Sequence, residues 1–260
     1  MNAMQCDEFE MTSTRQYFNT QFTLIIYYIL YLFKQIIVTT LAIINLAEDD
    51  MGVTVLQLYP AQENKTGPQV IETLTRRIVN LGAVQCGQFL VDCEVYQSTA
   101  QQQQPGAGGQ NRNLYILHNS EYPASVFSIL ECANKTVTLT SDTLFDLLML
   151  KLTNVYKKKT TIESKGPRFE IGDFIVKLGS VTVGGQFKGI LVEVEYSPGV
   201  VLNSSWGILK EFMQGFLGSC VGNNPPQQLV NKGADPFSAV DTIHQYLSHF
   251  NLFRKTAGQR

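Results

Sequence analysis

The 260-residue sequence is poor in charge, since Asp, Glu, Lys and Arg make up only 16% of it and the formal net charge at pH 7 is −2. A general nucleic-acid-binding protein needs a strongly basic surface, so this balance argues against direct binding of nucleic acid. The five cysteines include no C-x-x-C pair and are odd in number. They therefore fit a reducing compartment better than a disulfide framework.

The sequence also lacks the short motifs of common enzyme classes. It contains neither a P-loop nor a nucleophile elbow. The three histidines, His118, His244 and His249, do not have the spacing of metal ligands, and no cysteine completes a ligand set with them. We therefore expect no catalytic residue, no metal and no cofactor.

The stretch 168–217 has the most regular pattern in the sequence, and it predicts three strands followed by a helix. Hydrophobic residues alternate with other residues in 174–179 and again in 190–196. A period of two is typical of a strand that buries one face and leaves the other wetter. Gly184-Gly185 lies between the two runs and suits a tight turn between antiparallel strands.

The helix expected after these strands contains the candidate anchor residues Trp206, Phe212 and Phe216. Trp206 and Phe216 share one face of this helix with Leu209 and Met213, whereas Phe212 lies to the side of that stripe. The helix is too apolar to be solvated all round. The three aromatic side chains are therefore expected either to belong to the core or to anchor a partner protein.

Glu193 and Glu195 form the one constellation that could support catalysis. They alternate on a strand, so both carboxylates face one side, and a barrel interior on that side could hold a divalent metal. Tunnel-shaped triphosphatases are built in this way with a lysine two residues after the second glutamate, where this sequence has Ser197. The alternate apolar residues already supply a core face, so we expect both glutamates to point to water. A metal-dependent phosphohydrolase is the alternative function.

The whole chain predicts an α+β fold with about seven strands and four helices. Other strands are expected at 52–58 and 88–96, and two or three more at 114–117, 126–131 and 136–140. The other helices are expected after Thr66, after Ser141 and around Tyr246. The helices are segregated from most of the strands. Closing the antiparallel strands into a mostly closed β-barrel would remove exposed sheet edges.

Residues 1–50 differ in character from the rest of the chain. Residues 22–47 are almost continuously apolar and long enough for a membrane span, although Lys34 lies near the middle. Three explanations stay open: a gene-model artefact, a membrane anchor that would attach the protein to a membrane, or a disordered hydrophobic extension. From Met51 we expect a single domain, 51–260, with a low-complexity loop at 97–113.

Short segments spread from Met51 to Ser219 carry a family resemblance. They are Met51-Gly52-Val53-Thr54, Leu74-Thr75-Arg76-Arg77, Val91-Asp92-Cys93-Glu94 with Tyr96, His118-Asn119-Ser120-Glu121-Tyr122-Pro123, Phe145-Asp146, Asp173-Phe174 with Val176-Lys177, Val192-Glu193-Val194-Glu195-Tyr196 and Phe216-Leu217-Gly218-Ser219. In this order they resemble the subunit 20 family of the Mediator complex, a component of the Mediator head module in eukaryotic transcription. The resemblance does not reach residues 1–50, and 97–113 departs from it in composition.

The resemblance implies a β-barrel protein that pairs with Mediator subunit 18, a related barrel. It implies that a C-terminal helix of subunit 8 holds this pair to the head module. The expected function is that of a non-catalytic nuclear coactivator subunit, which helps to bridge regulators and RNA polymerase II without direct contact with nucleic acid or membrane. The residues agree with this function, because they predict a large core and no convergent polar site.

Overall fold

The computed structural model describes residues 52–60, 65–99, 112–132, 135–232 and 234–257. The chain divides into two units, and all of these residues belong to the second, Met51–Arg260. The predictions for residues 1–50 lie outside the described residues, as does 100–111 of the predicted loop at 97–113. Among the residues described, no α-helix combines the length and the hydrophobicity needed to span a membrane.

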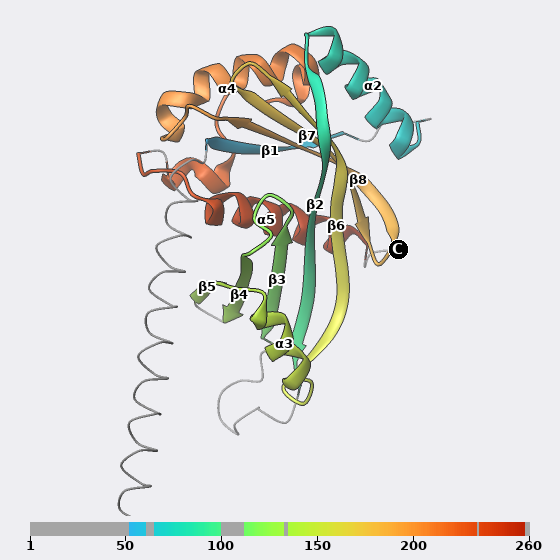
Figure 1. The fold of residues 1–260 in the computed structure, drawn as a ribbon, viewed down its shortest axis with the longest axis vertical. Helices are drawn as coiled ribbons and strands as arrows, with labels where there is room; N and C mark the ends of the chain where they lie inside the picture. The colour runs from blue at the N-terminus through green and yellow to red at the C-terminus, as the bar shows by residue number, and fades with distance from the viewer. Residues whose placement is uncertain (1–51, 61–64, 100–111, 133–134, 233, 258–260) are drawn as a thin grey trace, which may run out of the picture. The chain divides into compact units, whose positions relative to one another are not determined.

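Eight antiparallel strands form one sheet in the order β1-β8-β7-β6-β2-β3-β4-β5 (Figure 1). They are β1 Val53–Tyr59, β2 Val84–Ser98, β3 Asn113–Asn119, β4 Val126–Cys132, β5 Lys135–Ser141, β6 Tyr156–Ile171, β7 Phe174–Val183 and β8 Gln186–Tyr196. The two longest strands, β2 and β6, pair with each other along most of their length. They link β1, β8 and β7 at one end of the sheet to β3, β4 and β5 at the other.

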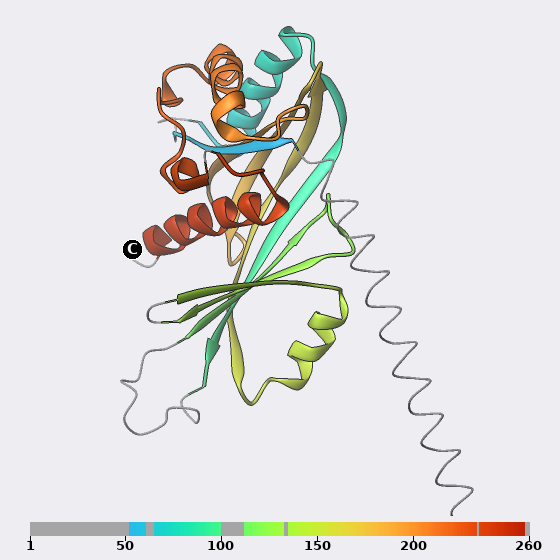
Figure 2. The same ribbon diagram turned by 90° about the vertical axis from the view of Figure 1, so that its left-hand side faces the viewer.

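Four α-helices in the described residues pack on this sheet, and the predicted α+β class is confirmed. They are α2 Gly67–Asn80, α3 Leu144–Lys151, α4 Leu202–Leu217 and α5 Ala239–Ala257, with short 3-10 helices at Gly218–Cys220 and Gln227–Lys232. Figure 2 shows α5 and α3 on opposite faces of the part of the sheet made by β3, β4 and β5. The helices α2 and α4 pack together over β1, β7 and β8, on the face opposite α5.

The strands beneath α2 and α4 are buried on both faces. In β8, Val192 packs in the core beneath α2 and α4, whereas its neighbour Leu191 packs against α5. The predicted turn of Gly184-Gly185 is confirmed, with φ of +56° and +80° in the hairpin that joins β7 to β8. These positive φ values are easily adopted by glycine and rarely by other residues.

The prediction of a mostly closed barrel is not confirmed. In the described part of the chain β1 and β5 are the two edges of the sheet, and no strand pairing joins them. Helix α5 contacts both edges: the side-chain amide of Gln245 bonds the backbone of Thr54 and Leu56 on β1, and His244 bonds Thr138 on β5. A helix therefore satisfies part of the β1 edge, and closure by strand pairing is not needed for that purpose.

Candidate functional site

The three candidate aromatic residues of α4 lie in different environments. Phe216 is buried in the core beneath α2 and α4. Phe212 is half-buried and stacks on Phe174 of β7, with ring centroids 4.0 Å apart and an interplanar angle of 4°. Trp206 is also half-buried, and its Nε1–H donates to the backbone oxygen of Asn223 at 3.1 Å. The helix thus directs two rings at the sheet and holds the third partly at the surface.

Trp206 forms one wall of a pocket of about 150 Å³ beside strand β1. The other lining residues are Leu56, Gln57, Leu58, Gly222, Asn224, Pro226, Gln228 and His249. Burial lowers the pKa of His249, so its imidazole is neutral at pH 7. The pocket offers aromatic, aliphatic and amide groups without a charged side chain, a combination suited to holding a neutral group rather than to acid–base chemistry.

The prediction that Glu193 points to water is wrong. Its side chain is 3% exposed, and Lys177 Nζ donates to Glu193 Oε1 at 2.8 Å. The hydroxyl of Tyr246 on α5 donates to the second oxygen, Oε2. Helix α5 covers this face of β8, so the alternation in β8 separates two buried faces instead of one buried and one wet face.

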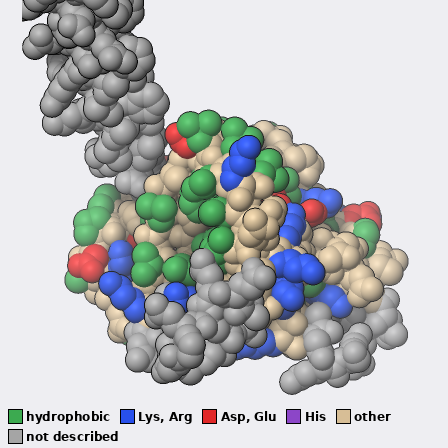
Figure 3. Space-filling view, turned by 90° about the horizontal axis from the view of Figure 1, so that it is seen from below, with side chains coloured by type: hydrophobic (Ala, Val, Ile, Leu, Met, Phe, Trp, Pro, Cys, Tyr) green, Lys and Arg blue, Asp and Glu red, His purple; other side chains and the backbone are tan. Residues whose placement is uncertain are grey.

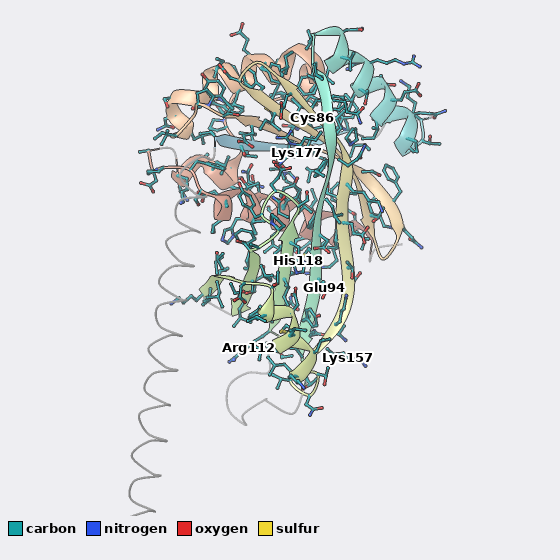
Figure 4. All side chains as sticks on the ribbon, viewed as in Figure 1. Cys86, Glu94, Arg112, His118, Lys157 and Lys177 are labelled. Carbon is teal, nitrogen blue, oxygen red and sulfur yellow. The ribbon has the colours of Figure 1, made fainter. Side chains whose placement is uncertain are left out.

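Two more glutamates surround the buried lysine, which is labelled in Figure 4. Glu121 Oε1 lies 3.7 Å from Lys177 Nζ, and Glu195 Oε1 accepts the backbone N–H of Gly52 at 3.4 Å. Burial alone lowers the pKa of Lys177, but the carboxylates of Glu193 and Glu121 outweigh it and hold this pKa above its usual value. Burial raises the pKa of the Glu195 carboxyl.

This cluster does not have the form of a metal site. Both oxygens of Glu193 are already engaged, by Lys177 and by Tyr246. The region that a tunnel would occupy is filled by side chains of α5, among them Tyr246 and Phe250. In the described ranges, no group of three or more His, Cys, Asp or Glu side chains is placed to hold a metal ion.

His118 lies between two carboxylates and ties α3 to the sheet (Figure 4). Its Nδ1 lies 2.7 Å from Asp92 Oδ1 on β2, and its Nε2 lies 3.2 Å from Asp146 Oδ1 on α3. The hydrogen bond to Asp92, aided by Asp146, raises the pKa of His118 to about 9 against the opposing effect of burial. Sequence reasoning missed this arrangement, because the three residues are far apart in the chain and have no motif spacing.

A face rich in exposed hydrophobic residues lies at the α3 end of the sheet. We call it the α3–β5 face, and it consists of Val137, Leu139, Leu144, Leu147, Leu148 and Leu150. Figure 3 views the protein from this end and shows hydrophobic side chains beside Lys and Arg side chains. Sequence reasoning predicted the helix but not its exposure. The available signal was that hydrophobic residues surround α3 on all sides.

Comparison with known proteins identifies the family. A family model described as the TATA-binding related factor (TRF) of subunit 20 of Mediator complex matches residues 51–251. Three relatives carry the name Mediator of RNA polymerase II transcription subunit 20. The Aedes aegypti relative is 54% identical over 216 residues, which cover 79% of this chain and 95% of the relative.

The Drosophila melanogaster relative is 48% identical over 222 residues, covering 79% of this chain and 87% of the relative. The Homo sapiens relative is 42% identical over 208 residues, covering 79% of this chain and 95% of the relative. These identities extend over nearly the whole of each relative, so they are not confined to one motif. The chain belongs to the Mediator subunit 20 family.

Proposed function

We propose that this chain is a non-catalytic subunit of the Mediator coactivator complex and works by presenting surfaces to other proteins. The observation that carries the proposal is the 54% identity to the Aedes aegypti protein named as subunit 20, over 95% of that relative. The site geometry supports it, because Glu193 is held by Lys177 and Tyr246 and is not free to bind a metal. Such a subunit acts in the nucleus.

For its partners we propose Mediator subunit 18 as the paired barrel and the C-terminal helix of subunit 8 as the tether to the head module. Support comes from the family model for Mediator subunit 20, which matches residues 51–251. Through these partners the chain helps to bridge regulators and RNA polymerase II. A formal net charge of −2 supports indirect rather than direct association with nucleic acid.

Among the aromatic residues of α4 we assign Trp206 to a partner interface and Phe212 and Phe216 to the core. Trp206 is half-buried and forms the wall of a pocket, and its Nε1–H is already engaged by Asn223, which fixes the ring. A rigid aromatic group beside a preformed pocket is the usual form of an energetically dominant interface residue. Phe212 instead stacks on Phe174, and Phe216 is buried.

The test measures binding of the full chain to subunit 18 from the same organism by calorimetry, together with thermal unfolding of the chain alone. Trp206→Ala is expected to weaken binding by about 2 kcal/mol or more, as for other interface anchors. Its effect on the free energy of unfolding should stay below the about 3–5 kcal/mol that a fully buried aromatic residue costs.

Two further variants serve as controls. Ile208 is exposed on α4 without lining the pocket, so Ile208→Ala should change neither binding nor melting. Phe216→Ala should destabilise the chain strongly, because Phe216 is 2% exposed. Unchanged binding by Trp206→Ala would remove Trp206 from the interface, whereas failure of the unmodified chain to bind any Mediator subunit would overturn the proposed function itself.

A further inference from the structure

A second surface lies at the other end of the sheet from α4 (Figure 1). The six side chains of the α3–β5 face are each between 43% and 70% exposed. Soluble proteins rarely leave so large a group of hydrophobic side chains uncovered in one region unless a partner covers it. Two questions then decide what the partner is: how these side chains are arranged, and which charges surround them.

The strand residues of the face lie on the same side of the sheet as α3. Val137 is opposite Leu130 and Leu139 is opposite Ser128 on the neighbouring strand β4. Opposite residues in a pair share a face, and Leu130 packs in the cluster that contains Met149 of α3. Helix α3 therefore covers β3 and part of β4 but leaves Val137 and Leu139 of β5 uncovered beside it.

Three of the four helix residues of the face form a stripe with Lys151. Leu144, Leu147, Leu148 and Lys151 follow the i, i+3, i+4, i+7 spacing that places side chains on one side of a helix. Met149 is the one fully buried residue of α3, and Phe145 packs partly buried in the same cluster. The ion pairs of His118 with Asp92 and Asp146 supply a second hold and keep the stripe in place.

The charges at one end of the face are positive and unpaired. Lys135 begins β5 and Lys151 ends α3, and neither forms an ion pair with any described acidic side chain. The two acidic residues between them are engaged locally: Asp142 accepts the backbone N–H of Leu144 at 3.0 Å, and Asp146 contacts His118. A partner that complements this face is therefore hydrophobic along the face and acidic at one end.

We propose that the α3–β5 face binds an amphipathic α-helix of a partner protein, whose hydrophobic stripe packs beside α3 over β5 and whose acidic residues meet Lys135 and Lys151. A β-strand added to the free edge of β5 would satisfy backbone groups but leave the leucines of α3 uncovered. A helix on this face covers both sets of side chains. The proposal rests on the proposed function only in that the chain acts by binding proteins, and its site is separate from the pocket at Trp206.

The probe is a helix-forming peptide of about 16 residues with leucines at i, i+3, i+4 and i+7 and with glutamates in one end turn only. Two control peptides carry lysines in place of the glutamates, or the same leucines spread around the helix. Binding of each to the full chain is measured by fluorescence anisotropy. The acidic amphipathic peptide is expected to bind at least about tenfold more tightly than either control.

Substitutions in the chain then locate the binding surface. Leu147→Glu and Leu139→Glu should each weaken binding of the acidic peptide at least about tenfold. Leu252→Glu is the matched control, since Leu252 is a similarly exposed leucine on α5, and it should leave binding unchanged. Lys135→Glu together with Lys151→Glu should reverse the preference so that the lysine peptide binds better. Thermal melting confirms that each variant is folded.

Three results would overturn the proposal. One is equal binding of all three peptides, and another is unchanged binding by a folded Leu147→Glu chain. The third is a homodimer in analytical ultracentrifugation that Leu147→Glu dissociates, because a second copy would then be the occupant. None of these results changes the Trp206 measurement with subunit 18, so failure here is distinguishable from failure of the proposed function.

Discussion

Lys177 on β7 and Glu193 on β8 are directly opposite each other in the sheet, and their charged atoms lie 2.8 Å apart with both side chains 3% exposed. The pair is buried because α5 covers this face, and Tyr246 of α5 donates to the same carboxylate. Two charges removed from water are tolerated only when each is well paired. The pair and Tyr246 therefore couple the central strands to the C-terminal helix.

Removing one partner of this pair should be strongly destabilising. Glu193→Gln leaves Lys177 buried with Glu121, at 3.7 Å, as its nearest remaining carboxylate. We expect the free energy of unfolding to fall by about 3–5 kcal/mol, the usual cost of leaving a buried charge uncompensated. Urea unfolding of both proteins measures the difference.

Two comparisons make the result specific. Glu163→Gln removes an exposed carboxylate that lies 3.5 Å from Lys165, and it should cost less than about 1 kcal/mol. The double change Lys177→Met with Glu193→Gln removes both charges and keeps a side-chain oxygen for Tyr246, so it should cost less than Glu193→Gln alone. A loss below about 1 kcal/mol for Glu193→Gln would contradict the buried pair.

The side-chain amide of Gln245 should also stabilise the fold, because it bonds the backbone of the edge strand β1. It accepts the backbone N–H of Leu56 at 3.1 Å and donates to the carbonyl of Thr54 at 3.0 Å, and it is fully buried. Gln245→Leu leaves two buried backbone groups without partners, at about 1–3 kcal/mol each. We expect a loss of about 2–6 kcal/mol.

Amide hydrogen exchange locates this effect. The Leu56 amide should exchange faster in Gln245→Leu than in the unmodified chain. Amides of β3 should exchange faster only to the extent that the global free energy of unfolding is lower. The exposed residue Gln228 provides the matched control, because its amide bonds the Ser248 side chain at the surface. If Gln228→Leu and Gln245→Leu lowered stability equally, the amide of Gln245 would not be the reason.

The sequence predicted where strands, helices and turns lie in the chain better than it predicted which of their faces are buried. Local signals, such as the period of two in β8 and the glycine pair at 184–185, correctly predicted strands and a turn. They could not show that a helix 50 residues later would bury Glu193, because periodicity reports that two faces differ and not what covers each. The same limit applies to the predicted barrel, because no local pattern shows that Gln245, and not a neighbouring strand, bonds the backbone of β1.

The candidate site was predictable only in part. The aromatic residues of α4 stood out, since Trp206 is the only tryptophan in the chain. Which of these aromatic residues are buried depends on the rotation of α4 about its own axis relative to β7. The hydrophobic stripe in the sequence defines this rotation only to within about one side-chain position. The exposed leucines of α3 look like core residues in the sequence, and only the packing shows that Met149 alone is buried.

A chain that begins at Met51 should fold without residues 1–50. The family model matches 51–251, and every segment that carries the family motifs lies at or after Met51. The melting temperature of this shorter chain should lie within about 2 °C of the full chain, which corresponds to less than about 1 kcal/mol. Differential scanning calorimetry makes the comparison, and aggregation of the shorter chain alone would contradict the expectation.

The charge of His118 should make stability depend on pH in a defined window. Its pKa is about 9 in the folded chain, compared with about 6.5 for an unperturbed histidine. A raised pKa means that the folded state binds the proton more tightly. The stabilisation is therefore complete below about pH 6.5 and is lost as the pH rises through about 9. Because the imidazole of His118 is partly exposed, we expect its charge to contribute only about 1–2 kcal/mol to the free energy of unfolding.

Unfolding free energies measured between about pH 7.5 and 9.5 test this, with His118→Gln as the comparison. Burial lowers the pKa of His244 and His249, so both are neutral throughout this window and add no slope. Burial raises the pKa of Cys93, which adds a slope, but that slope is common to both proteins and cancels. Part of the stabilisation is already lost between about pH 6.5 and 7.5, so the unmodified chain should lose about 1 kcal/mol more than His118→Gln over the window. Parallel curves would show that the contacts with Asp92 and Asp146 do not hold a charged imidazole. Helix α3 would then depend on the packing of Phe145 and Met149 for its place on the sheet.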